Sequence, residues 1–185
     1  MNLLTQRSQH IRHWLALCAI ALLSACSSQD ISQYRAERPT LDLASYFNGK
    51  VIAHGIFQNR SGQVVKRFTV DMDSHWVGDQ GVLDEHFTYA DGKTERRVWR
   101  LTKHADGHYS GTADDVVGTA RGQSAGNAFQ WAYTLKLPVD GSVYEVQFDD
   151  WMYLIDDRVM INRATMSKFG VRLGEVTLSF HKAAP

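Results

Sequence analysis

The sequence predicts an all-β protein, a single antiparallel meander that closes into a barrel of about eight to ten strands. Runs that alternate apolar and polar residues, the pattern of strands with one buried face, recur from Lys50 to the end of the chain. Short turn signals such as Asp91-Gly92 separate these runs, and no long helical pattern interrupts them. Closing such a sheet buries its apolar face and removes its exposed edges.

Residues 1–25 have the order of an export signal. Met1–His13 carries Arg7 and Arg12 and no acidic residue, and the uncharged run Trp14–Leu23 follows. This run is shorter than the stretch of about 20 apolar residues that crosses a bilayer. The alternative is that this run forms a buried helix of the mature domain. The sequence disfavours this alternative, because no amphipathic segment flanks the run. We therefore expect residues 1–25 to be a signal peptide that is removed.

The residues Leu23-Ser24-Ala25-Cys26 resemble the lipobox of bacterial lipoproteins, in which small residues precede a cysteine that is lipidated and becomes the new N-terminus. This resemblance implies a lipoprotein signal peptide and several acyl chains on Cys26, which together anchor a protein permanently. Ser27 stands where an Asp commonly signals retention in the inner membrane. We therefore expect a periplasm-facing protein, lipid-anchored to the outer membrane, with residues 26–39 as its lipidated N-terminus and tether.

The cysteine count and the net charge limit the chemistry that we expect of the mature domain. Cys18 leaves with the signal and Cys26 is lipidated, so we expect no disulfide. The whole chain has 20 basic and 20 acidic residues, and losing the signal leaves a small acidic excess. A near-neutral chain without a basic run gives no reason to propose nucleic acid as a partner. Residues 40–185 are predicted to form one β-barrel domain.

The elements of this domain follow from residue patterns. Thr40–Phe47 is predicted to form one or two helical turns, with Thr40 as N-cap, that plug a barrel end or cover the sheet. Asn48-Gly49-Lys50 is similar to the start of lipocalin-type barrels, although Val51 replaces their usual tryptophan, so the barrel is predicted to be lipocalin-like (calycin-type). The predicted strands are Val51–Asn59, Val64–Trp76, Val82–Ala90, Lys93–Lys103, His108–Ala113, Val116–Gly122, Ala128–Leu137, Val143–Ile155, Val159–Met166 and Gly174–His181.

Two hairpins predict which residues face each other. A two-residue turn at Asp156-Asp157 places Asp150 opposite Arg163, next to apolar residues on one face. At Asp91-Gly92, a three-residue loop with a left-handed glycine separates charged from apolar faces better than a two-residue loop. That loop pairs Glu85 with Trp99 on the apolar face.

No catalytic or metal site can be identified in the sequence. Asp71, Asp73 and His75 are metal-ligand types at strand spacing, but they lie opposite the apolar face of their strand and are interpreted as solvated, with a metal site as the alternative. Cysteine catalysis is excluded, and Gly118–Gly126 lacks the lysine of a phosphate cradle. We predict no catalytic residue, no metal and no cofactor. Whether the protein is an enzyme stays open, and a non-enzyme is favoured.

The candidate functional residues are aromatic and charged side chains on faces that are otherwise apolar. Buried charge is tolerated only when it is paired, so the charged residues form structural pairs, or an arginine holds a carboxylate or phosphate head group inside the barrel. The aromatic residues form core or line a ligand. The residues predicted to line a ligand are Glu85, Arg97, Trp99, Phe129, Trp131, Tyr133, Phe148, Asp150, Met152 and Arg163.

Five segments carry a resemblance to a known family. They are residues 67–72 (RFTVDM), 111–118 (GTADDVVG), 133–141 (YTLKLPVDG), 148–162 (FDDWMYLIDDRVMIN) and 166–175 (MSKFGVRLGE). The chain resembles the Gram-negative lipoprotein family catalogued as domain of unknown function 3833, over nearly all of the mature sequence. This resemblance implies a periplasm-facing lipoprotein and assigns no activity or catalytic residue.

Three functions remain, and the sequence orders them. The favoured one is a non-enzymatic binder of an acyl or similarly apolar small molecule that supports envelope lipid homeostasis. The second is an interaction module with a filled barrel core that docks another envelope protein. The third is an enzyme that acts on lipids. A cavity inside the barrel distinguishes the first from the second.

Replacing Cys26 with serine tests the predicted anchor. Cys26→Ser is expected to abolish acylation and outer-membrane fractionation, because no other cysteine remains after cleavage. Metabolic labelling with an alkyne fatty acid measures the acylation directly. Label that persists on the variant would refute the lipobox assignment.

Overall fold

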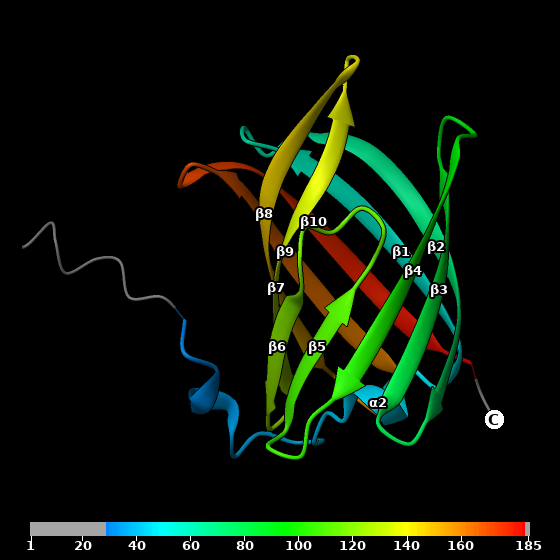
Figure 1. The fold of residues 1–185 in the computed structure, drawn as a ribbon, viewed down its shortest axis with the longest axis vertical. Coiled ribbons are helices and arrows are strands. Elements are labelled where there is room, and N and C mark those ends of the chain that lie inside the picture. Colours follow the sequence, from blue (N-terminus) through cyan, green and yellow to red (C-terminus); the bar gives the residue numbers. More distant parts are fainter. Residues whose placement is uncertain (1–28, 184–185) are drawn as a thin grey trace, which may run out of the picture. The chain divides into compact units, whose positions relative to one another are not determined.

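The computed structural model describes residues 29–183, and ten antiparallel strands close into a barrel (Figure 1). The predicted fold class, an all-β antiparallel meander that closes into a barrel and has a short N-terminal helical turn, is confirmed. The predicted signal peptide and Cys26 lie outside the described residues. Residues from Ile31 onward form a compact unit of their own.

Two short helical segments precede the strands. Among the described residues, no helix has the length and apolar character that crossing a membrane requires. The elements are η1 (Ile31–Tyr34), α2 (Leu43–Tyr46), β1 (Gly49–Asn59), β2 (Val64–Val77), β3 (Gln80–Tyr89), β4 (Thr94–Lys103), β5 (His108–Thr112), β6 (Ala120–Ala125), β7 (Ala128–Val139), β8 (Ser142–Leu154), β9 (Val159–Lys168) and β10 (Val171–Lys182).

The first and last strands close the sheet. Each strand pairs with its neighbours in sequence, and β1 pairs with β10 from Val51 opposite Lys182 to Asn59 opposite Gly174. Because side chains alternate across a strand, one set from every strand faces a common interior. The unit from Ile31 onward therefore encloses its own core, and we expect it to fold by itself.

The predicted strand Val116–Gly122 is displaced. A turn precedes it, in which the Val116 amide donates to the Ala113 carbonyl at 3.0 Å, and Gly118 has a left-handed φ of 68° that breaks the strand. The segment between β5 and β6 instead rests on β7 through a single bridge between Val116 and Leu135. β6 begins at Ala120, beyond this interruption.

The predicted helical turn is present as α2, and it lies at one end of the barrel (Figure 1). Its N-cap is Asp42 rather than Thr40, because the Asp42 carboxylate accepts a hydrogen bond from the Ser45 amide at 2.8 Å. Asp42 also forms an ion pair with Lys103 on β4. The indole of Trp76 donates to the carbonyl of Phe47 at 2.9 Å, so polar contacts hold the segment against the barrel.

Part of the segment predicted to be a tether, residues 26–39, is folded against the barrel. Ile31 in η1 is buried against Ala128 and Trp151, and the ring of Tyr34 lies 5.4 Å from that of Tyr153. Burying these apolar side chains against the outer face of β7 and β8 offsets the entropy of ordering the segment. Residues from Ile31 onward therefore belong to the folded unit rather than to a free tether.

Candidate functional site

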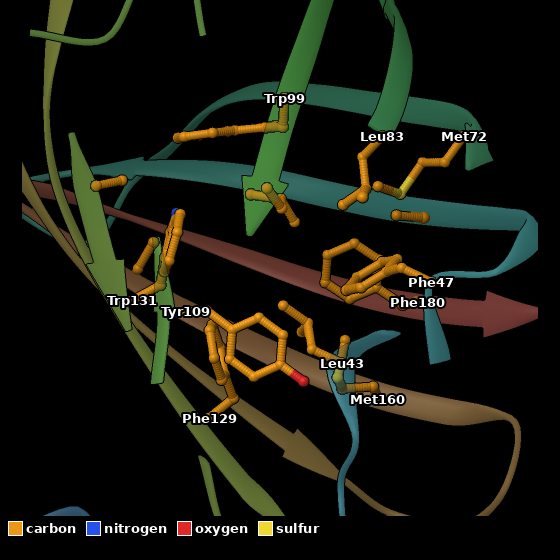
Figure 2. Close-up of a cluster of buried hydrophobic side chains, with 14 of the residues drawn as sticks. Leu43, Phe47, Met72, Leu83, Trp99, Tyr109, Phe129, Trp131, Met160 and Phe180 are labelled. Atoms are coloured by element: carbon orange, nitrogen blue, oxygen red, sulfur yellow. The ribbon is translucent and has the colours of Figure 1, made fainter. Parts of the chain in front are cut away.

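The barrel contains a cavity of about 250 Å³. Leu43 and Phe47 reach into one end of the barrel, where the rings of Phe47 and Phe180 pack edge to face at 5.5 Å (Figure 2). At the opposite end, the lining side chains of Phe57 and Tyr89 are only partly buried. The cavity therefore has a closed end at α2 and a mouth among the hairpins at the other end.

All predicted lining residues except Arg163 lie along this cavity. Aromatic rings form a large part of its wall. Trp99 packs edge to face on Trp131, with ring centroids 5.7 Å apart (both are labelled in Figure 2), and on Tyr133 at 5.3 Å. Tyr133 in turn stacks on Phe148, with ring centroids 5.0 Å apart. The lining residues are Glu85, Arg97, Trp99, Phe129, Trp131, Tyr133, Phe148, Asp150 and Met152. Their contact with a ligand stays a prediction.

The predicted pairing of Asp150 with Arg163 is wrong. Asp150 lies opposite Ala164, and Arg163 lies opposite Trp151. The Arg163 side chain is 64% exposed on the outside of the barrel, where its Nε donates to a Glu175 oxygen at 2.8 Å. Arg163 therefore cannot hold a head group in the cavity.

The reason for this error lies in the turn between β8 and β9. One oxygen of Asp156 accepts hydrogen bonds from the amides of Arg158 and Val159, both at 2.8 Å, and the Ile155 amide donates to the Val159 carbonyl. This arrangement makes the loop one residue longer than predicted. A slip of one residue turns every side chain of a strand to the other face.

The hairpin between β3 and β4 keeps its predicted faces but not its predicted partners. Its loop has three residues and a left-handed Gly92 with φ 83°, but the loop begins one residue earlier than predicted. The pairing therefore shifts by two residues, which preserves the faces. Glu85 lies directly opposite Arg97 instead of Trp99.

Arg97 is the centre of a charged network in the wall. Its Nε and Nη2 donate to the carboxylate of Asp115 at 2.9 and 2.8 Å, a two-pronged contact. Its Nη1 lies 3.9 Å from an oxygen of Glu85, and its guanidinium lies 5.4 Å from the ring centroid of Phe87. The donors of Arg97 are thus directed at acids of the protein itself.

A second polar group lies across the cavity on β8 and β9. The Tyr133 hydroxyl donates to one oxygen of Asp150 at 3.3 Å, while the other Asp150 oxygen is buried without a hydrogen-bond partner in the described chain. Asn162 is 1% exposed, and neither its amide oxygen nor its amide nitrogen has a partner there. A buried polar atom left unpaired costs about 1–3 kcal/mol. These unpaired atoms belong to residues that line the cavity.

Burial changes the protonation of the two interior acids. It raises the pKa of Glu85 to about 7, although the Arg97 guanidinium opposes the shift. It likewise raises the pKa of Asp150 to about 7, although the hydrogen bond from Tyr133 opposes that shift. Both carboxyls therefore change charge near neutral pH.

Sequence reasoning missed Asp115 and Asn162. The sequence pattern places Asp115 in a turn, and only the folded chain brings that turn beside Arg97. The predicted register of β8 and β9 places Asn162 on the outer face, which is wrong. The sequence does hold a signal for the correct face, because Met160, Ala164 and Met166 share the alternate positions of the strand with Asn162 and carry no charge, whereas the other set contains Arg163. The burial of these three residues agrees with that signal.

Asp71, Asp73 and His75 are exposed, in agreement with their interpretation as a solvated face. Within residues 29–183, no group of three or more His, Cys, Asp or Glu side chains is placed to hold a metal ion.

The fold and the site define a closed β-barrel with an aromatic cavity and a polar interior cluster. The chain belongs to the family described as Protein of unknown function (DUF3833), whose model matches residues 20–182. No curated protein is detectably similar in sequence.

Solved structures share the architecture. An S-type phycobiliprotein lyase, CPES from Guillardia theta, superposes with a TM-score of 0.60 at 7% identity, covering 85% of this chain and 99% of that one. Apocrustacyanin C2 matches at 20% identity and lobster apocrustacyanin A1 at 18%, with TM-scores of 0.40 and 0.39. Each of these two matches covers 86% of this chain and 72% of the other. At 7% identity, the likeness to the lyase shows a shared fold.

The raised pKa of Asp150 predicts a pH-dependent stability. The folded state keeps this proton to a higher pH than the unfolded state, so the free energy of unfolding falls as pH rises from about 4 to about 7 and is level above that. Asp150→Asn keeps an acceptor for Tyr133 and removes the charge. We expect it to stabilise the domain by about 2–4 kcal/mol at about pH 8 and much less at about pH 5.

Thermal and urea melts at the two pH values measure this difference. Asp73→Asn, which neutralises an exposed acid on the outer face, is the matched control and is expected to change little at either pH. A stabilisation by Asp150→Asn that is equal at both pH values would contradict the prediction.

Proposed function

We propose that the protein is a non-enzymatic binding protein that holds an acyl or similarly apolar small molecule in its barrel. The proposal includes its anchoring to the outer membrane through Cys26, facing the periplasm, in a role in envelope lipid homeostasis. The observation that carries it is the aromatic cavity with unpaired polar atoms in its wall. An apolar pocket with a few placed polar groups is the usual form of a small-molecule site.

The shape of the cavity favours a slender ligand. Its volume of about 250 Å³ lies just below the range of about 300–1,000 Å³ typical of sites for drug-sized molecules. On β7 its lining extends from Phe129 to Leu137, which corresponds to about 26 Å along the strand. A small volume spread over this length suits a chain-like molecule better than a bulky ring system. A cavity also disfavours the alternative of a filled core.

The hairpin tips at the mouth support a ligand that comes from a lipid surface. Lys168 lies between them, with its Nζ 5.5 Å from the ring centroid of Tyr144 and 5.0 Å from that of Phe169. Basic side chains beside exposed apolar ones suit an anionic membrane interface. We call the exposed apolar side chains of these tips the apolar rim; they are Val139, Val143, Tyr144, Phe169, Val171 and Leu173.

Phe169 is the most exposed member of the apolar rim. It is 90% exposed, and its φ of 51° lies in the left-handed region, which costs a non-glycine residue about 1–2 kcal/mol. Neither burial nor backbone preference explains a phenylalanine here. Insertion of its ring into a lipid surface would explain it.

Filling the cavity tests the proposed function. Ala164 lies on the inner face of β9 and lines the cavity, so Ala164→Phe places a ring inside it. We expect saturable binding of Nile red to the domain beginning at Ser28, weakened about tenfold or more by Ala164→Phe. Thr165→Phe adds the same ring at the next position, which faces outward, and is expected to leave binding unchanged. Absence of saturable binding to the unmodified domain would refute the proposal.

Changing the apolar rim tests the source of the ligand. Phe169→Asp is expected to slow transfer of a fluorescent fatty alcohol from anionic vesicles by about tenfold. The reason is that the charged side chain replaces the aromatic ring that inserts into the membrane interface. Its equilibrium affinity for Nile red should not change, since Phe169 does not line the cavity. Val77→Asp, at the α2 end and 76% exposed in the native side chain, is the control. Equal transfer rates for the two variants would exclude uptake through the apolar rim.

A further inference from the structure

We propose that the ligand carries a head group that donates hydrogen bonds, an amine foremost, and that this head group binds at Asp150 and Asn162. The inference rests on the proposed function and names the chemistry of the ligand that the cavity selects. It replaces the expectation that an arginine holds a carboxylate or phosphate.

The cations of the cavity do not favour an anionic head group. Among the described lining residues, Arg97 and Lys66 are the cations, against the acids Glu85, Glu95 and Asp150. The Arg97 donors are occupied by Asp115, with Glu85 3.9 Å away, so a carboxylate would have to displace an acid of the protein. Lys66 lies exposed at the mouth, where water screens its charge.

The unpaired atoms on β8 and β9 are mainly acceptors. One oxygen of Asp150 and the amide oxygen of Asn162 are buried in residues that line the cavity, and both lack a donor in the described chain. The two residues occupy neighbouring inner positions, because Asp150 pairs with Ala164 and Asn162 pairs with Met152. One ammonium or hydroxyl group can therefore donate to both. The Asn162 amide nitrogen adds a donor for the oxygen of a hydroxyl head.

The charges around Asp150 favour a cation further. The titratable groups that face it are Tyr133 from β7, Arg97 from β4 and Glu85 from β3, with Asp149 adjacent on its own strand. The residues of β9 opposite it, Asn162 and Ala164, carry no charge. Asp115 takes the short hydrogen bonds of Arg97, and Glu85 keeps only the longer 3.9 Å contact with it. An ammonium ion here would therefore face two carboxyls that are incompletely paired. Its arrival would also favour their ionised forms.

Three ligands with the same tail and different heads test the inference. Dodecylamine, dodecanol and dodecanoate compete with the neutral dye Nile red for the domain beginning at Ser28, below their aggregation limits and at about pH 8, where the amine is charged and the interior acids are largely ionised. We expect half-displacement by the amine at a concentration about tenfold or more below that for dodecanoate, with the alcohol between them.

Variants assign this preference to the proposed residue. Asp150→Asn is expected to weaken dodecylamine about tenfold and dodecanol much less, because only the charge is removed. Glu85→Gln, which removes the second interior acid, serves as an independent variant. Asp73→Asn, an exposed acid of the outer face, is the matched control and should leave all three affinities unchanged.

The outcomes separate the inference from the function on which it rests. Binding of dodecanoate equal to or tighter than that of the amine would overturn the head-group inference and leave the binding function standing. An amine preference that persists in Asp150→Asn would also overturn it, whatever the result for Glu85→Gln. If Nile red shows no saturable binding and none of the three ligands competes, the proposed function fails, and the inference fails with it.

Discussion

The pairing of β1 with β10 is the constraint on which the rest of the structure depends. It joins the two ends of the meander, so that no strand of the described barrel has a free edge. It also directs one face of every strand toward a single interior. Glu85 and Asp150, far apart along the chain, influence each other's charge only because the sheet closes. The cavity and its polar cluster are consequences of that closure.

The interior of the barrel contains both packed aromatic rings and buried polar side chains. Rings such as Trp99, Trp131 and Tyr133 pack edge to face against one another and bury large apolar surfaces. The Arg97 network is paired, as buried charge requires, and it forms part of the wall. Asp150 and Asn162 are not fully paired, which reduces stability in the empty barrel. Under the proposed function, this cost is offset when the head group of the ligand pairs with these atoms.

The two ends of the barrel differ in a way that gives the cavity one mouth. At the closed end, polar contacts tie the α2 segment to the strands: the Tyr46 hydroxyl donates to the Arg158 carbonyl at 2.9 Å, and Lys182 donates to the Ser45 carbonyl at 2.5 Å. At the other end, the hairpins leave apolar side chains such as Phe169 in solvent. One end is held closed by these contacts, and the other is the mouth through which we propose that a ligand enters.

The sequence by itself determined the class of fold, the approximate limits of most strands and the inward direction of all but one of the residues predicted to line a ligand. Alternation with period two is a local property that survives small errors in strand limits. Only the tertiary structure decided the registers. The side chain of Asp156 lengthened one loop by a residue, which turned Arg163 outward and Asn162 inward. A loop residue, Asp115, became the partner of Arg97 because the connection between β5 and β6 folds beside β4. These long-range placements decide the charge of the site, since the local pattern of a strand does not specify what faces it across the barrel.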